Sequence, residues 1–248
     1  MPAVEGTRNV LASCSKLGVK KVVLTASMAS VYVNYGNLPP DHVYTERDWS
    51  DETLMREKNN WYCLSKTVAE RLAWEMSREP GCSYELAVMN PTLILGPQLP
   101  GQPHLNTSSA FIVNFMDGSM KEIDNTSRAL VDVRDVAEAH VAAFETPGAM
   151  GRRYVLIGSS AHCADIAASV RRALPEALKA NVASVVSSTI PPAVMGNPPP
   201  APILFDSSPS QELFGIKYVS VDEMIATTVS SCLENGFNHR DLYITEKL

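Results

Sequence analysis

The sequence contains no long apolar run and no secretory signal. No hydrophobic stretch among its 248 residues approaches the 18 residues that indicate a membrane-spanning helix. The first residues have neither the basic flank nor the apolar centre of a signal peptide. We therefore expect a soluble, cytoplasmic protein with no membrane partner.

Disulfide, metal and nucleic-acid patterns are missing as well. The five cysteines form no C-x-x-C pair and the five histidines no H-x-x-x-H pair, so we expect free thiols and no metal site. Lys and Arg number 21 against 27 Asp and Glu, which gives a formal net charge of −6. Nucleic-acid binding needs a basic face, so this balance argues against such a partner and favours a small ligand.

What the sequence does contain is an alternation of helical and strand patterns. An amphipathic segment, 4–17, precedes the non-alternating apolar run 21–27, which is typical of a parallel strand covered on both faces. The polar stretch 28–57 predicts a long surface loop. Similar patterns predict further strands at 84–90, 128–133 and 152–157, and helices at 59–77, 161–174, 208–214 and 221–234.

The helix predicted at 59–77 carries Tyr62 and Lys66 four residues apart. This spacing puts both side chains on one face of a helix, about 5 to 6 Å apart at Cβ. A fixed cation beside a phenol favours the phenolate, so the pair is a candidate for proton transfer. The same spacing also suits an ordinary amphipathic helix with a solvated Lys and a half-buried Tyr, and the two residues alone do not distinguish these interpretations.

Two strand ends are candidate ligand sites. Ser27 lies at the carboxyl end of the strand at 21–27 and Pro91 at the carboxyl end of the strand at 84–90, the edge where open α/β sheets bind ligands. Taken alone, Ser27 also fits a plain turn residue, and Pro91 an ordinary strand end. Asp132 and Asp135 stand where carboxylates stabilise a helix N-terminus, so we expect a structural role for them. Thr107 and Ser108 are the predicted caps of a helix that starts near residue 110.

As a set, these segments resemble the extended short-chain dehydrogenase/reductases, in the NAD-dependent epimerase/dehydratase fold group, and among them the dihydroflavonol and cinnamoyl-CoA reductases. The run NWYC at 60–63 is similar to the cinnamoyl-CoA reductases of this group. The run LSK at 64–66 is more similar to their relatives in the group, so the identity of the substrate stays open. The matching segments occur in family order along nearly the whole chain: 4–11, 22–31, 60–70, 90–97, 131–137 and 207–224.

The resemblance implies an α/β fold, part of a Rossmann-type doubly wound parallel sheet with a small C-terminal substrate-binding lobe. Residues 1–160 would form the catalytic half of the dinucleotide-binding domain. Residues 161–248 would form most of the lobe, with helices that return to the sheet.

The resemblance also implies the roles of individual residues. Ser27, Tyr62 and Lys66 would be catalytic: Tyr62 would protonate a substrate carbonyl, Ser27 would hydrogen-bond its oxygen, and Lys66 would lower the pKa of Tyr62 and hold the nicotinamide ribose. The expected cofactor is NADP, with NAD as a possibility. The residues expected to contact the cofactor are Thr25, Ala26, Tyr62, Lys66, Pro91, Thr92, Leu93, Ile94 and Ser108.

The sequence departs from the family at one motif. Family members begin with a strand and a Gly-rich turn that binds the pyrophosphate, and no G-x-x-G-x-x-G occurs here. By analogy roughly 80 or more residues, about half of a dinucleotide-binding sheet, are not in this sequence. It is therefore expected to be either a fragment or a degenerate member, and to bind NADPH weakly or not at all by itself.

Three functions remain open on this evidence. The first is an NADP-dependent reductase of a small carbonyl substrate, favoured by the joint presence of Ser27, Tyr62 and Lys66. The second is a non-catalytic remnant or a dinucleotide-sensing relative, favoured by the missing glycines. A sugar-nucleotide epimerase or dehydratase is weaker, because the run at 60–63 resembles the reductases. The substrate and the oligomeric state are not determined by the sequence.

Overall fold

The computed structural model describes residues 1–34, 36–39, 41–120, 123–179 and 203–237. Two compact units divide the chain. The first unit consists of Met1–Thr92, Val136–Leu156 and Ile203–Lys217, and the second of the described residues within Leu93–Asp135, Ile157–Pro202 and Tyr218–Leu248. The chain passes from one unit to the other several times, because consecutive strands such as Glu85–Pro91 and Leu93–Leu95 belong to different sheets. The expected catalytic half at 1–160 and substrate lobe at 161–248 stay predictions.

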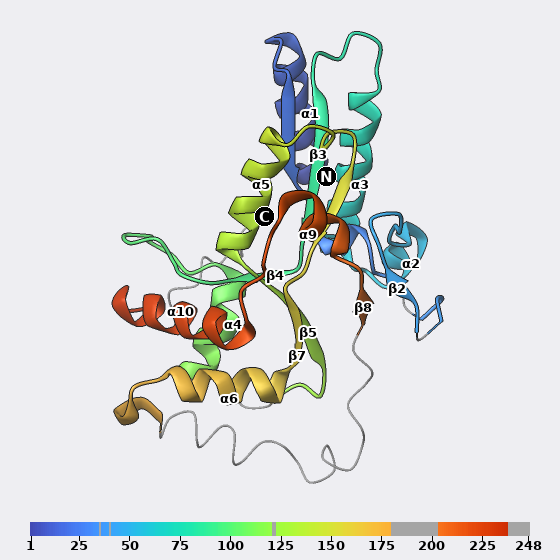
Figure 1. Ribbon diagram of the computed structural model, residues 1–248. Helices are drawn as coiled ribbons and strands as arrows, with labels where there is room; N and C mark the ends of the chain where they lie inside the picture. The colour runs from blue at the N-terminus through green and yellow to red at the C-terminus, as the bar shows by residue number, and fades with distance from the viewer. Residues whose placement is uncertain (35, 40, 121–122, 180–202, 238–248) are drawn as a thin grey trace. The chain divides into compact units, whose positions relative to one another are not determined.

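The first unit is built on a parallel sheet with the strand order β1–β3–β6. β1 is Lys21–Thr25, β3 is Glu85–Pro91 and β6 is Arg153–Leu156 (Figure 1). The central strand β3 is buried at every position after Glu85, as its apolar sequence predicts. A separate parallel pair joins β2 (Val43–Tyr44) to β8 (Leu204–Phe205).

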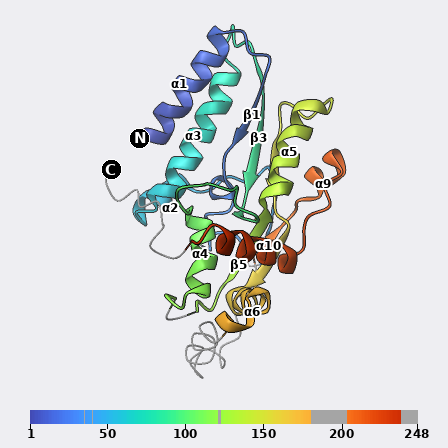
Figure 2. The same ribbon diagram turned by 90° about the vertical axis from the view of Figure 1, so that its left-hand side faces the viewer.

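Helices cover both faces of this sheet. α1 (Pro2–Lys16) and α3 (Trp61–Ser77) lie side by side on one face, and α5 (Val133–Glu145) lies on the other (Figure 2). Apolar side chains fill the layer between α1, α3 and the sheet, including Leu11, Leu72, Ala73, Leu86 and Val88. The unit is therefore a three-layer α/β structure, which agrees with the predicted fold class.

The segment 28–57 is more regular than its polar composition predicts. It contains the 3₁₀ helix η1 (Met28–Ser30), strand β2 and helix α2 (Glu52–Glu57). Asp51 caps α2, because its Oδ1 accepts a hydrogen bond from the Leu54 backbone N at 3.0 Å. The expectation of a single irregular loop was wrong, since these elements are too short to give a clear periodic pattern.

The second unit contains the sheet β4–β5–β7. β4 (Leu93–Leu95) pairs in parallel with β5 (Ser127–Asp132), which pairs antiparallel with β7 (Ser159–His162). Its helices are α4 (Thr107–Met116), α6 (Cys163–Ala173) and α10 (Val221–Glu234). Their shared core includes Leu105, Ile112, Phe115, Leu130, Ile166 and Met224. The short helix α9 (Ser208–Phe214) packs on β6 in the first unit.

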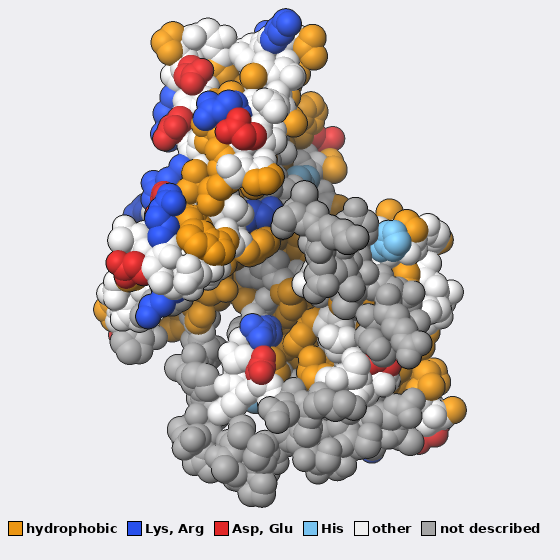
Figure 3. All heavy atoms as spheres, turned by 180° about the vertical axis from the view of Figure 1, so that it is seen from behind, with side chains coloured by type: hydrophobic (Ala, Val, Ile, Leu, Met, Phe, Trp, Pro, Cys, Tyr) orange, Lys and Arg blue, Asp and Glu red, His pale blue; other side chains and the backbone are white. Residues whose placement is uncertain are grey.

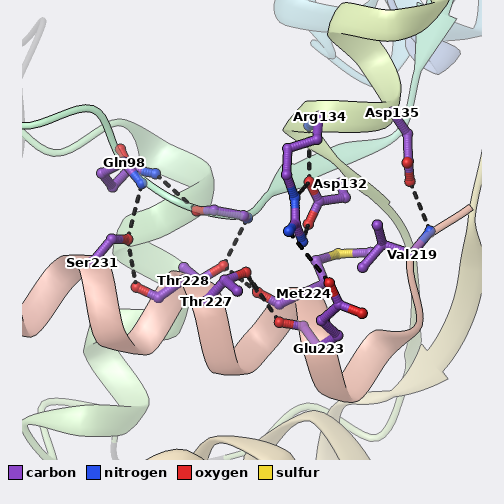
Figure 4. A network of polar contacts seen from close by, with 11 residues as sticks. Gln98, Asp132, Arg134, Asp135, Val219, Glu223, Met224, Thr227, Thr228 and Ser231 are labelled. Atoms are coloured by element: carbon purple, nitrogen blue, oxygen red, sulfur yellow. Dashed lines mark hydrogen bonds and ion pairs between the residues drawn. The ribbon is translucent and has the colours of Figure 1, made fainter.

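Polar bonds fix α10 beside β4 in the second unit (Figure 4). The Thr228 hydroxyl accepts from the Gly96 N–H at 2.7 Å, and the Ser231 hydroxyl from the Gln98 N–H at 2.9 Å. Asp132 is fully buried and accepts from both the backbone and the guanidinium of Arg134, which raises the pKa of that guanidinium. The Asp135 carboxylate accepts from the Val219 N–H at 3.0 Å. These contacts are structural, as the sequence predicts for both aspartates.

Within the described residues, no helix combines the length and the hydrophobicity that crossing a bilayer requires. The proline-rich stretch of the sequence at 190–200 lies outside the described residues.

Gly96 is the glycine for which replacement by alanine should be most costly. Its φ is +117°, and an added Cβ would lie 2.9 Å from Val133 Cγ1 and 3.0 Å from each carboxylate oxygen of Asp132. We expect Gly96→Ala to lower the free energy of unfolding by about 2 to 4 kcal/mol, because backbone strain and overpacking add. Denaturant titration measures this.

The matched control is Gly6→Ala on α1, where an added Cβ meets open space. It should stabilise the protein by about 0.5 to 1 kcal/mol, because alanine is the better helix former. A Gly96→Ala variant as stable as wild type would show that the contacts around Gly96 relax freely.

Candidate active site

Ser27 lies just beyond the carboxyl end of β1, where it caps η1. Its Oγ accepts a hydrogen bond from the Ala29 N–H at 3.1 Å, so the hydroxyl hydrogen remains available for donation to another group. The side chain is half-buried. Ser27 therefore fills the turn role that its sequence context allows and still presents a donor.

Tyr62 and Lys66 stand in the first turns of α3. Asn60 caps this helix by accepting from the Cys63 N–H at 3.3 Å. Tyr62 is 64% exposed, Lys66 is half-buried, and the Lys66 Nζ lies 6.0 Å from the centre of the Tyr62 ring. In the described part of the chain neither the phenol nor the ammonium has a hydrogen-bond or ion-pair partner. Both polar groups are therefore free to meet a ligand.

Two side chains, one on α3 and one on β3, hold the segment around Ser27 in place. The Thr67 hydroxyl, next to Lys66 in sequence, lies 3.3 Å from the Ala29 carbonyl and 2.9 Å from the Cys63 carbonyl. The Asn90 amide near the end of β3 donates to the Ser27 carbonyl at 3.1 Å. Ser27 is thus tied to both the helix that carries Tyr62 and the strand that ends at Pro91.

Four residues expected to contact the cofactor belong to the same end of the first unit's sheet. The Thr25 hydroxyl and His140 Nε2 are 2.7 Å apart, and His140 Nδ1 lies 2.7 Å from the Val136 carbonyl. Because Nδ1 faces a carbonyl oxygen, which can only accept, Nδ1 carries the hydrogen of the neutral imidazole. Nε2 of that tautomer then accepts from the Thr25 hydroxyl. Ala26 N–H donates to Met89 O, and Thr92 N–H to Leu156 O. The fourth of these residues, Pro91, pairs with Leu156 on β6.

The other three, Leu93, Ile94 and Ser108, belong to the second unit. Leu93 and Ile94 pair with Leu130 and Val131 of β5, and Ser108 is the second residue of α4. The cap of α4 is Asn106, whose Oδ1 accepts from the Ser109 N–H at 2.8 Å. The prediction that Thr107 or Ser108 caps the helix was therefore wrong, because the helix starts about one turn earlier than expected.

A buried ion pair behind Ser27 was not found from the sequence. Glu70, one turn after Lys66 on α3, is 1% exposed and its Oε1 lies 2.5 Å from the Arg153 Nε. Asn90 donates to its other oxygen at 2.8 Å. The Arg153 guanidinium also donates to the backbone carbonyls of Glu46 at 2.9 Å and Asp48 at 2.7 Å.

A signal for this pair was present in the sequence. Arg153 directly precedes the apolar residues of the strand predicted at 152–157, and a charged side chain in a buried strand needs a partner. The sequence did not identify the partner, because Glu70 lies 83 positions earlier, on a helix where it resembles an ordinary surface residue.

Comparison with known proteins identifies the family. Residues 2–158 match the NAD dependent epimerase/dehydratase family. The chain belongs to this family. It is 36% identical over 237 residues to cinnamoyl-CoA reductase 1 of Arabidopsis thaliana, a match that covers 95% of this chain and 64% of that protein. It is 30% identical to the putative NADPH-dependent methylglyoxal reductase GRP2 of Candida albicans, covering 92% of this chain and 69% of that protein.

Solved structures agree with the fold. Gre2 from Candida albicans matches with a TM-score of 0.80 and 28% identity, over 95% of this chain and 72% of that one. Yeast methylglyoxal/isovaleraldehyde reductase Gre2, complexed with NADPH, matches with a TM-score of 0.77 and 29% identity, over 94% and 70%. The resemblance to the extended short-chain dehydrogenase/reductases and the Rossmann-type α/β class are confirmed. The chain spans about two thirds of the length of these relatives.

We expect Glu70→Gln to lower the free energy of unfolding by about 3 to 5 kcal/mol, because it leaves the buried Arg153 charge without a counterion. Replacing both Glu70 and Arg153 with Met should cost less than the sum of the two single replacements, since neither charge is then stranded. Denaturant unfolding followed by tryptophan fluorescence measures these differences.

The control is Glu52→Gln, which breaks the more exposed pair between Glu52 and Arg71. It should cost at most about 1 kcal/mol, because exposed ion pairs are well solvated. Equal losses of unfolding free energy in Glu70→Gln and Glu52→Gln would show that burial does not increase the contribution of the pair between Glu70 and Arg153.

Proposed function

We propose that this chain carries the catalytic residues of an NADP-dependent carbonyl reductase. The substrate would be a ketone or an aldehyde of the dihydroflavonol or cinnamoyl type. The observation that carries the proposal is the pairing of an exposed Tyr62 with Lys66 one turn later, both without other polar partners in the described chain. The names of the relatives support it, since they include cinnamoyl-CoA reductases and an NADPH-dependent methylglyoxal reductase.

The residues at this site fit a nicotinamide nucleotide. The unpaired ammonium of Lys66 suits a ribose hydroxyl, and the β1 and β3 strands end where parallel sheets of this class bind dinucleotides. When bound there, the reduced nicotinamide supplies the hydride that reaches the carbonyl carbon. NADP is proposed over NAD because the C. albicans and yeast relatives are described with NADPH.

The side chains of this chain manage the proton and the oxygen charge. The Ser27 hydroxyl, whose oxygen is occupied by the Ala29 N–H, donates its hydrogen to the substrate carbonyl oxygen. The Tyr62 hydroxyl gives its proton to the same oxygen, which completes the alcohol. The positive charge of Lys66 stabilises the phenolate that remains. Tyr62 then regains a proton from water, to which it is largely exposed.

Replacing Tyr62 tests this assignment. Tyr62→Phe should lower kcat/KM for carbonyl reduction by about 10² to 10⁴, the usual contribution of a positioned acid. The measurement is NADPH consumption by the natural protein that carries this chain, with cinnamoyl-type aldehydes and small ketones as substrates.

Tyr84→Phe is the matched control, because it removes one hydroxyl from a buried tyrosine ahead of β3. Burial raises the pKa of Tyr84 to about 12, and its hydroxyl has no hydrogen-bond partner, so the variant should keep its rate and its stability. A Tyr62→Phe protein that keeps most of its rate would remove Tyr62 from the mechanism. A wild-type protein that reduces none of these carbonyls would favour the non-catalytic alternative.

A further inference from the structure

The first unit contains a cavity that is lined by arginine side chains. It has a volume of about 590 Å³, within the size range of small-molecule sites. Five of the chain's 12 arginines line it, together with two of its three tryptophans. On the face drawn in Figure 3, basic and acidic side chains of the first unit lie interspersed. The arginines in question are Arg47, Arg71, Arg78, Arg152 and Arg153.

Two of the five have carboxylate partners. Arg153 pairs with the buried Glu70, and Arg71 with Glu52 at 2.9 Å. Both guanidinium groups also lie over the ring of Trp49, at 3.7 and 4.2 Å from its centre. These two form a fixed, already neutralised wall of the cavity.

The remaining three have no carboxylate within ion-pair distance in the part of the chain that the structure describes. They come from separate segments: Arg47 from the loop after β2, Arg78 from the end of α3, and Arg152 from the residue before β6. The position of Arg78 has a local explanation, because a cation at a helix C-terminus is favourable. The Arg152 guanidinium lies over the ring of Tyr154, 5.6 Å from its centre, and within the described residues Arg47 has no ion pair or ring contact.

Two glutamates also line the cavity, and they limit its positive charge. Glu75 lies exposed on α3. Glu46 is half-buried, and its Oε1 is shielded from solvent without a hydrogen-bond partner. Burial raises the pKa of the Glu46 carboxyl. The three unpaired arginines therefore exceed the remaining carboxylate charge.

The arrangement suits an anion with several oxygens. Guanidinium groups repel one another when they gather, and planar N–H forks bind phosphate oxygens in pairs. We propose that this cavity binds a phosphate-bearing small molecule, with Arg47, Arg78 and Arg152 as its anion ligands. This site would be separate from Tyr62, since the nearest α3 residue that lines it, Arg71, lies nine positions further along the helix, or about 13 Å.

The test uses inorganic pyrophosphate and isothermal titration calorimetry on the natural protein at constant ionic strength. We expect saturable one-to-one binding that Arg47→Gln combined with Arg152→Gln weakens by about tenfold or more. Both side chains are exposed and lack ion pairs in the described structure, so the variant should fold, which its thermal melt will check. Arg78→Gln alone gives a second variant that should weaken binding in the same direction.

The matched control removes the same two charges elsewhere, by Arg8→Gln combined with Lys16→Gln on α1. It should leave the affinity for pyrophosphate unchanged within about twofold, because neither residue lines the cavity. Absence of saturable binding overturns the proposal. Equal weakening in both double variants also overturns it, because the attraction would then come from net charge and not from this cavity. The result is independent of carbonyl reduction, since Tyr62→Phe should leave pyrophosphate binding intact.

Discussion

The buried pair of Glu70 and Arg153 is the constraint on which the first unit depends. An ionised carboxylate and a guanidinium removed from water are unfavourable unless their hydrogen-bonding groups are satisfied. Here Glu70 receives bonds from Arg153 and Asn90, and Arg153 has further acceptors in the carbonyls of Glu46 and Asp48. Together these bonds join four segments: α3, β3, β6 and the loop that carries Glu46 and Asp48. Movement of any one segment would strand a buried charge, so the network fixes their mutual positions.

This constraint reaches the candidate catalytic residues through short connections. Glu70 lies on α3 one turn after Lys66, and Asn90 bonds both Glu70 and the Ser27 carbonyl. The hydroxyl of Ser27, the phenol of Tyr62 and the ammonium of Lys66 thus belong to elements that one polar network holds together. Preorganised groups of this kind lose little free energy to reorientation when a substrate binds. Other contacts hold the helix that carries Tyr62, so its position does not depend on a polar partner for the exposed phenol.

The sequence predicts those parts of this architecture that rest on local patterns. Non-alternating apolar runs indicated β1 and β3, and the helices α3, α9 and α10 begin and end close to the predicted residues. The Tyr62 and Lys66 spacing needs only helix geometry, so the pair could be found before the structure. Two-residue strands such as β2 and β8 were missed, because their register depends on a partner far away in sequence. The bounds of the two units likewise depend on which strands pair and not on composition.

Helix α3 carries residues of both proposed sites. At 3.6 residues per turn, the nine positions from Tyr62 to Arg71 rotate the side chain by roughly 180°, so the two residues lie on opposite sides of the helix. The face with Tyr62 and Lys66 is open for chemistry, and the face with Arg71, Trp74 and Arg78 lines the arginine-rich cavity. Glu70 stands between these faces and anchors the helix through Arg153, which is itself part of the cavity wall. Arg153 thus belongs both to the wall of this cavity and to the ion pair that holds α3, the helix that carries Tyr62 and Lys66.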